Sequence, residues 1–367
     1  MKKAILLPRK FIQGRGVISE VGEYAAMLGK KAVILWGKRA KAASGEAVLK
    51  SLADAGVAAA ELEFCGETTK AEAERVAQAA QDADLVIGIG GGKCIDAAKG
   101  GAIYAKLPHI IVPTVASNDA PTSACTVWYD DDGVCTGFDM WPANPDYILV
   151  DTDIIVAAPV RLFVAGIGDA IATWYEADLN DQSRAVTCSG GTATLTALAM
   201  AKLCRDTIFE YGLKAIADVS AHVVTPAVDK VVEATTLLSG VGWESGGLAT
   251  AHALANAFPA LPETHGFYHG EKVAFGLVAQ LCLDDAIDPE LAEATVAFLV
   301  QAGLPVCFAD LNIAGVSEER LRAFAADTAG EGSFVHNHPR VVTGGDLYDA
   351  LVSADVFGRR VKAESGA

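Results

Sequence analysis

Long apolar runs are missing from this 367-residue chain, although hydrophobic residues make up 51% of it. No uninterrupted run approaches the ~20 residues that a membrane-spanning helix needs. The short apolar patch near the N-terminus ends at Pro8, Arg9 and Lys10 and is too brief for a signal-peptide core. The eight cysteines contain no C-x-x-C pair, which disfavours a disulfide framework and fits reduced thiols. We therefore expect a globular protein of the cytoplasm.

Positive charge is also scarce, because 29 basic residues face 46 acidic ones and the net charge is −17. Such a chain repels nucleic acids and anionic lipid surfaces alike. The expected partner is a small molecule. The length exceeds what one hydrophobic core usually supports, so two domains are expected.

The hydrophobic pattern changes near the middle of the chain. Before it, β-prone runs such as KAVILWG, DLVIGIG, PHIIVPT and DYILVD alternate with helical stretches, which predicts a parallel sheet flanked by helices. Within this part, VWYDDDGVCTGF reads as a hairpin. Beyond it the sequence becomes alanine-rich with few β-branched runs. We predict an α/β domain over 1–157 and an all-α domain over 158–367.

The segment LVIGIGGGKCIDAAK places three glycines between an apolar strand and a helix. A helix start offers unpaired N–H groups and a positive dipole end, and Gly90, Gly91 and Gly92 have no Cβ to keep a pyrophosphate away. Tight packing alone also produces such turns, so the segment by itself is a weak indication of a nucleotide cofactor.

Three polar residues lie in apolar helical segments of the second half: Asp169, His252 and His269. A lone buried carboxylate needs a neutralising partner, and one carboxylate with two imidazoles suits Zn²⁺ or Fe²⁺ with an open position. A single histidine on an apolar helix is more often a hydrogen-bonded core residue, and it is the combination of three polar residues that favours a metal site. His265 is a reserve ligand, while His336 and His338, beside a proline, read as ordinary exposed loop residues.

Several long motifs, in order, resemble the group III, iron-containing family of metal-dependent alcohol dehydrogenases. They are GIGGGKCIDAAK, PTVASNDAPTSACTVWY, AGIGDAIATWYEA, GWESGGLATAHA and FYHGEKVAFG, and the resemblance runs from about residue 10 to about 355. It implies a dehydroquinate-synthase-like architecture, in which a dinucleotide-binding domain joins a helical domain and the substrate, metal and nicotinamide meet between them. It also implies a homo-oligomer, commonly an octamer.

The resemblance assigns roles by motif. Asp169, His252 and His269 correspond to the metal ligands, and Asp119 corresponds to the carboxylate that touches a substrate hydroxyl. The residues that correspond to the cofactor site are Gly91, Gly92, Lys93 and the nearby Asp96, followed by Thr114, Ser117, Ser123, Cys125 and Tyr129.

The chain departs from the family pattern in two places. NAD-using members have an acidic residue after the strand that reads KAVILW here, whereas this chain has Gly37, Lys38 and Arg39. A glycine leaves room for a 2′-phosphate and the adjacent cations attract it, so we expect NADP to be accepted. Ala255 stands where related sequences often have a further histidine. Because this polar group is lost, the pocket could favour a less hydroxylated diol or a 2-hydroxy or 2-oxo compound over glycerol.

The expected activity is hydride transfer between a small polyol, glycerol or a 1,2-diol, and NAD or NADP, giving a hydroxyketone, with Zn²⁺ or alternatively Fe²⁺ at the metal site. Other possibilities are an NADP(H)-dependent reductase of 2-oxo or 2-hydroxy compounds, a sugar-phosphate cyclase or a polyol-phosphate dehydrogenase. The phosphate-handling enzymes need several basic residues at the substrate, and the matched motifs supply only Lys93 and Lys272. A non-catalytic nucleotide sensor would keep the glycine loop but has no need of the metal set.

Overall fold

The computed structural model describes residues 2–130, 133–283 and 287–366, and it divides into two compact units. The first, here called the sheet unit, comprises Leu6–Phe163 and Ala217–Gly240. The second, the helical unit, comprises Met1–Ile5, Val164–Ile216 and Val241–Ala367. Each unit thus combines separate stretches of the chain, and the single domain boundary after residue 157 stays a prediction.

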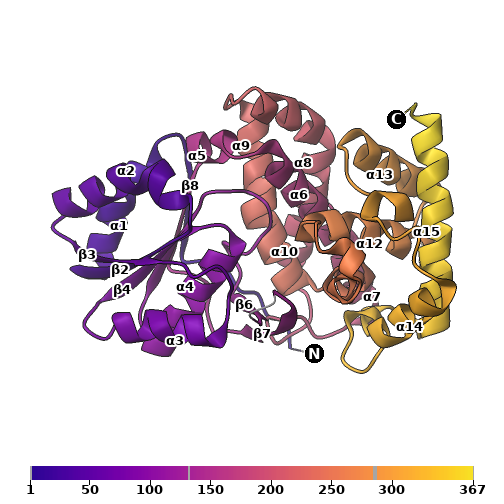
Figure 1. Cartoon of the computed structure of the whole chain (residues 1–367), viewed down its shortest axis with the longest axis horizontal. Helices are drawn as coiled ribbons and strands as arrows, with labels where there is room; N and C mark the ends of the chain where they lie inside the picture. Colours follow the sequence, from indigo (N-terminus) through magenta and orange to yellow (C-terminus); the bar gives the residue numbers. More distant parts are fainter. Residues whose placement is uncertain (1, 131–132, 284–286, 367) are drawn as a thin grey trace. The chain divides into compact units, whose positions relative to one another are not determined.

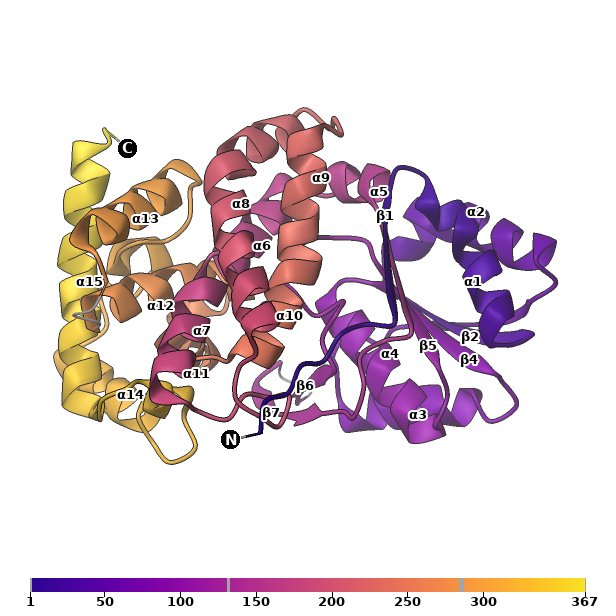
Figure 2. The ribbon, with the colours of Figure 1, turned by 180° about the vertical axis from the view of Figure 1, so that it is seen from behind.

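The sheet unit is built on six parallel strands in the order β1-β8-β5-β4-β2-β3 (Figures 1 and 2). The β4, β5 and β8 strands are buried along their whole length, which explains why their sequences are continuous apolar runs instead of alternating ones. In register, Trp36 pairs with Ile89 and Gly90 with Pro113, so β2, β4 and β5 end at one edge of the sheet. The strands are β1 (Lys10–Gly14), β2 (Lys31–Trp36), β3 (Ala58–Glu63), β4 (Leu85–Gly90), β5 (His109–Pro113) and β8 (Tyr147–Asp151).

Helices cover both faces of this sheet (Figure 1). Alternate strand residues such as Ile34 and Ile87 join one buried cluster with residues of α1 and α2. On α4, Ala98 lies so close to Gly88 of β4 that an added Cβ would come within 2.5 Å. The helices are α1 (Val21–Leu28), α2 (Ala40–Asp54), α3 (Lys70–Ala79), α4 (Gly92–Ala105), α5 (Thr152–Ala157) and α9 (Pro226–Glu233), with short helical turns η1 (Val17–Glu20) and η2 (Ala234–Leu238).

The predicted hairpin is confirmed as the antiparallel pair β6 (Cys125–Tyr129) and β7 (Cys135–Met140). Its expected turn includes Asp131 and Asp132, which lie outside the described residues. The expected strands of the parallel sheet are also confirmed, but β1 and α1 were not predicted. The β1 sequence, KFIQG, is short and partly exposed, so it carries little of the apolar signal that marks the inner strands.

A buried lysine anchors the loop between β5 and β6. Lys99 of α4 is 1% exposed, and its Nζ lies 2.8 Å from Asp96 Oδ1. The same ammonium group donates hydrogen bonds to the backbone oxygens of Ala120 (2.9 Å) and Ser123 (3.2 Å). Because a buried charge must be paired and hydrogen-bonded, these contacts fix the loop against α4.

The helical unit confirms the expected helical second half (Figure 1). Side chains of N-cap residues accept hydrogen bonds at the start of several of its helices. Thr343 and Asp346 form a reciprocal capping box at α15, and Ser317 caps α14. The helices are α6 (Val160–Ala170), α7 (Ala172–Ser183), α8 (Leu195–Ser220), α10 (Ser239–Gly246), α11 (Thr250–Ala257), α12 (His269–Leu283), α13 (Pro289–Gln301), α14 (Glu318–Thr328) and α15 (Gly344–Glu364), with short turns η3 (Phe258–Ala260), η4 (Pro262–Thr264), η5 (Phe308–Leu311) and η6 (Phe334–Asn337).

Among the helices of the described residues, none combines the length and apolar character that a bilayer crossing requires.

Candidate metal and cofactor sites

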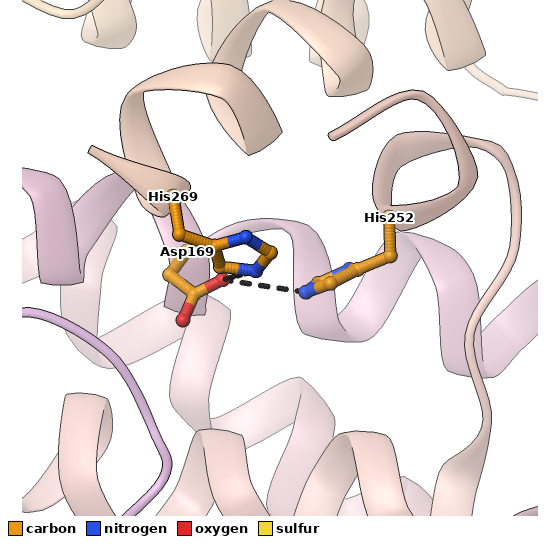
Figure 3. Close-up of side chains that lie close together, drawn as sticks. All are labelled: Asp169, His252 and His269. Carbon is orange, nitrogen blue, oxygen red and sulfur yellow. Dashed lines mark ion pairs between the residues drawn. The ribbon is translucent and has the colours of Figure 1, made fainter. Parts of the chain in front are cut away.

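The three predicted metal ligands come together inside the helical unit. Asp169 lies near the end of α6, His252 in the first turn of α11, and His269 at the first position of α12. Their side chains point toward one another in Figure 3. One ligand atom from each lies within 4.8 Å of the others. Within the described residues this is the group of histidine, cysteine and acidic side chains that could hold a metal ion.

The distances fit a zinc-sized ion. Asp169 Oδ1 lies 3.3 Å from His252 Nε2 and 3.4 Å from His269 Nε2. Ligands about 2.0–2.1 Å from a tetrahedral Zn²⁺ are separated by about 3.3 Å, so one ion could contact all three atoms. Asp169 is 1% exposed, whereas the side chain of His269 is 36% exposed, which leaves one side of the group accessible.

Glycines allow the ligand-bearing helices to approach closely. Gly270 follows His269, and a Cβ there would lie 1.8 Å from the backbone oxygen of Ala165. Gly168 precedes Asp169, and a Cβ there would lie 2.5 Å from the backbone oxygen of Gly270. On the other side, a Cβ on Gly276 of α12 would lie 2.4 Å from the oxygen of Ala251, next to His252. Backbone-to-backbone contact at these glycines sets the spacing of the ligands.

Burial and neighbouring charge act differently on the two imidazoles. Burial acts to lower the pKa of His252, but the carboxylates of Glu176 and Asp169 raise that pKa well above its usual value. Burial lowers the pKa of His269 to about 4, since the opposing effect of Asp169 is smaller. His269 therefore stays neutral, as a metal ligand must, while the two carboxylates favour positive charge at His252, next to the position of a bound cation.

Glu176 was not among the predicted site residues. This carboxylate of α7 is completely buried, and it contacts Nδ1 of His252. A signal was present in AGIGDAIATWYEA, where a second carboxylate, Glu176, follows Asp169 by seven residues in the same apolar stretch.

The other histidines of the second half do not join the group. Nε2 of His265 lies 2.9 Å from the backbone oxygen of Pro259, and His336 pairs with that of Gly330. His338 is buried, so the expectation of an exposed loop residue was wrong. The turn η6 brings it against α11, where its Nε2 lies 2.9 Å from Thr250 Oγ1.

The predicted phosphate-binding glycines lie at the edge where β2, β4 and β5 end. Gly91 is the N-cap residue of α4, in extended conformation, and as a glycine it has no side chain with which to cap this helix. A Cβ on Gly37, after β2, would lie 3.1 Å from the Cα of Gly90. Thr114, after β5, donates its N–H to the oxygen of Gly90 at 3.0 Å. The helix start, Gly37 and Thr114 are thus brought together.

Basic side chains flank this edge. Lys38 and Arg39, before α2, are exposed. Lys93 Nζ lies 2.5 Å from Glu67 Oε2 and 4.5 Å from the centre of the Tyr129 ring. Burial raises the pKa of the Tyr129 hydroxyl, so this phenol stays neutral.

Several other predicted cofactor residues contact the protein's own backbone. The Asp96 carboxylate pairs with Lys99 and accepts the N–H of Val127 at 3.0 Å. Ser123 Oγ lies 3.3 Å from Lys99 Nζ. Cys125 is buried at the start of β6, while Gly92 and Ser117 are partly exposed. Asp96 and Ser123 thus support the loop, and their contact with a cofactor stays a prediction.

Asp119 lies in the same loop. Ser239 donates its hydroxyl to Asp119 Oδ2 at 2.6 Å. The neighbouring Thr122 donates to the oxygen of Thr236 at 2.8 Å, within the wide turn η2. A Cβ on Gly240 would lie 1.9 Å from Thr122 Oγ1, so the loop is closely packed against the first turn of α10.

Sequence comparison identifies the family to which this arrangement belongs. Residues 8–152 match the family model described as iron-containing alcohol dehydrogenase. Glycerol dehydrogenase from Pseudomonas putida is 43% identical, over 98% of this chain and 99% of its own. The chain belongs to the iron-containing alcohol dehydrogenase family. It is accordingly an enzyme, an alcohol dehydrogenase that acts on CH–OH donors.

Two further members extend the comparison. Glycolaldehyde reductase from Halobacterium salinarum is 39% identical, over 97% of this chain and 98% of its own. The crystal structure of glycerol dehydrogenase from Schizosaccharomyces pombe superposes with a TM-score of 0.95 at 34% identity, covering 100% of this chain and 93% of that one. The predicted fold class and family resemblance are thereby confirmed, and membership of this alcohol dehydrogenase family agrees with the expectation of a nicotinamide cofactor and a metal ion.

We predict that Gly270→Ala weakens metal binding, because its methyl group forces α12 away from Ala165 and separates His269 from Asp169. Overpacking of this kind costs about 1–3 kcal/mol of stability or more. Isothermal titration with Zn²⁺ should show at least a tenfold higher Kd, and the melting temperature should fall. Gly315→Ala is the control, since a Cβ there meets no atom within 4 Å. Wild-type zinc affinity in Gly270→Ala would contradict this account.

Proposed function

We propose that this enzyme oxidises a small polyol, glycerol or a 1,2-diol, to the hydroxyketone with a nicotinamide dinucleotide, and catalyses the reverse reduction. The observation that carries the proposal is the group Asp169, His252 and His269, with its two nearly equal oxygen-to-nitrogen separations of 3.3 and 3.4 Å. Full-length relatives named glycerol dehydrogenase support the choice of polyol.

The donor set suits Zn²⁺, with Fe²⁺ as the second choice, because a carboxylate and two imidazoles bind both ions. When bound, such an ion lowers the pKa of an alcohol and stabilises the developing alkoxide. The protein's part is to hold the ligand atoms in place: α6 and α12 meet at glycines, and Glu176 contacts the outer nitrogen of His252. The more exposed His269 lies on the accessible side.

In the sheet unit, we propose that the pyrophosphate of the dinucleotide binds at Gly91, Gly92 and the start of α4. The N–H groups at the start of the helix and the helix dipole favour an anion there. Gly37 leaves space at the end of β2, and the ammonium group of Lys93 adds positive charge. Thr114, Ser117, Ser123, Cys125 and Tyr129 are proposed to line the rest of the cofactor.

A second candidate is the reduction of a small 2-hydroxy aldehyde or a 2-oxo compound. Ala255, one turn after His252 on α11, is 1% exposed and offers no hydrogen bond to a third hydroxyl. The relative named glycolaldehyde reductase supports this choice. The ratio of kcat/KM for glycerol to that for 1,2-propanediol, with glycolaldehyde assayed in the reverse direction, separates the two candidates.

The proposed reaction requires the metal. We expect turnover of glycerol or 1,2-propanediol to disappear after dialysis against a chelator, because nothing then stabilises the alkoxide, and to return when Zn²⁺ or Fe²⁺ is added. The measurement is the absorbance of the reduced nicotinamide at 340 nm, with the metal content determined on the same samples. Turnover that survives complete removal of the metal would exclude this mechanism.

The cofactor choice is tested at Lys38 and Arg39. We propose that NADP is accepted, since the usual ribose-binding carboxylate is absent and both side chains are exposed cations. The double substitution Lys38→Ala/Arg39→Ala should lower kcat/KM for NADP at least tenfold, about 1.4 kcal/mol, and change that for NAD less than threefold. Lys30→Ala/Lys31→Ala is the control, because it removes equal charge at the opposite end of β2. A tenfold preference of the wild type for NAD would refute the proposal.

Asp119 is proposed to bind a non-reacting hydroxyl of the substrate. Its Oδ2 accepts the hydroxyl of Ser239, which orients the carboxylate. We expect Asp119→Ala to raise KM for glycerol at least tenfold while KM for a simple monohydric alcohol changes less than threefold. The measurement is steady-state kinetics on both substrates at saturating cofactor. An equal loss on the two substrates would contradict the assigned role.

A further inference from the structure

The carboxylate of Glu176 makes a specific set of contacts beneath the metal ligands. Its Oε1 accepts the backbone N–H of Ala249 at 2.8 Å and that of His252 at 2.9 Å. Its Oε2 contacts Nδ1 of the same histidine. The side chain is 0% exposed, so protein groups determine its orientation.

These contacts explain how α11 begins. The N-cap residue is Ala249, whose methyl side chain cannot accept a hydrogen bond, and no side chain of the helix itself caps it. The first N–H groups of a helix need acceptors. Oε1 of Glu176 supplies one from a different helix, α7, and thereby holds the turn that carries His252.

The second oxygen determines which nitrogen of His252 carries the proton. An ionised carboxylate only accepts hydrogen bonds, so Nδ1 must donate. In a neutral imidazole the lone pair is then on Nε2, the nitrogen that lies 3.3 Å from Asp169 Oδ1. A metal ligand nitrogen needs this lone pair, and a carboxylate behind a ligating histidine fixes both its tautomer and its ring orientation.

We propose that Glu176 is a positioning residue of the metal site, which caps α11 through Oε1 and presents the lone pair of His252 Nε2 through Oε2. This role rests on the proposed metal site. It assigns to one side chain two separable tasks, one for the stability of the fold and one for metal affinity.

Glu176→Gln separates the two tasks. The N–H groups of Ala249 and His252 both require an acceptor at the position of Oε1, so the amide oxygen must take that place and the cap is kept. The NH₂ group is then forced to face Nδ1. A donor there favours the tautomer with the proton on Nε2, and metal binding must displace that proton. In the full-length protein stripped of metal, we expect Kd for Zn²⁺ and Co²⁺ to rise 10- to 100-fold, with little change in the melting temperature.

Glu176→Ala is expected to lower the melting temperature more than Glu176→Gln does, but to weaken metal binding less. It removes the cap and leaves a cavity, so the melting temperature of the metal-free protein should fall further than in Glu176→Gln. It places no donor against Nδ1, so either tautomer is available and Kd should rise less than in Glu176→Gln. The variant that is more stable is thus expected to bind metal more weakly.

Gln280→Met is the matched structural control. Oε1 of Gln280, on α12, accepts the N–H of Ala251 at 2.9 Å and so supports the same helix start. Methionine removes this acceptor at similar size. We expect a lower melting temperature and a Kd for Co²⁺ within threefold of the wild type, measured from the visible absorption of bound Co²⁺.

The outcomes are distinguishable. Unchanged metal affinity in Glu176→Gln, with binding by the wild type, overturns the role of Glu176 and leaves the metal site standing. The role is also overturned if Kd rises in proportion to the fall in melting temperature across Glu176→Gln, Glu176→Ala and Gln280→Met. A wild-type protein that binds neither Zn²⁺ nor Co²⁺ overturns the metal site and this role together.

Discussion

Asp169 imposes the constraint on which the helical unit depends. A carboxylate that is 1% exposed cannot stay ionised among apolar helices without positive charge or donors close by. Its near neighbours are two imidazole nitrogens, 3.3 and 3.4 Å away. The helices that carry these three residues must therefore approach more closely than ordinary side chains permit, and glycines stand at the contacts on either side of the group.

A buried charged side chain also orders part of the sheet unit, and there it is the cation Lys99. Lys99 neutralises Asp96 and binds the backbone of the loop that contains Asp119. In both units a buried charge thus orders a segment that carries proposed site residues. Burying a charged group lowers the stability of the fold, but near a site it fixes the positions of the neighbouring side chains.

Much of this was accessible from the sequence. The inner strands were predictable because burial on both faces leaves continuous apolar runs. The grouping of Asp169, His252 and His269 was predictable because polar residues in apolar helices require partners. The edge strand β1 was missed because it is only partly buried. Glu176 was missed although it follows Asp169 by seven residues, because its contacts depend on α7 lying beside the start of α11, and the sequence does not show this tertiary contact. The cytoplasmic location and the oligomeric state stay predictions.

The path of the chain has a consequence for how the molecule forms. Residues 2–5 belong to the helical unit, where Lys3 pairs with Thr192 and the oxygen of Ala4 accepts the hydroxyl of Ser189. Their partners are synthesised nearly two hundred residues later, which at ~5–20 residues per second is a delay of roughly 10–40 s. During translation the sheet unit likewise lacks residues 217–240. The sheet unit can therefore complete its folding only after residue 240 has been synthesised, and the helical unit only near the end of the chain, and neither corresponds to one continuous fragment for expression.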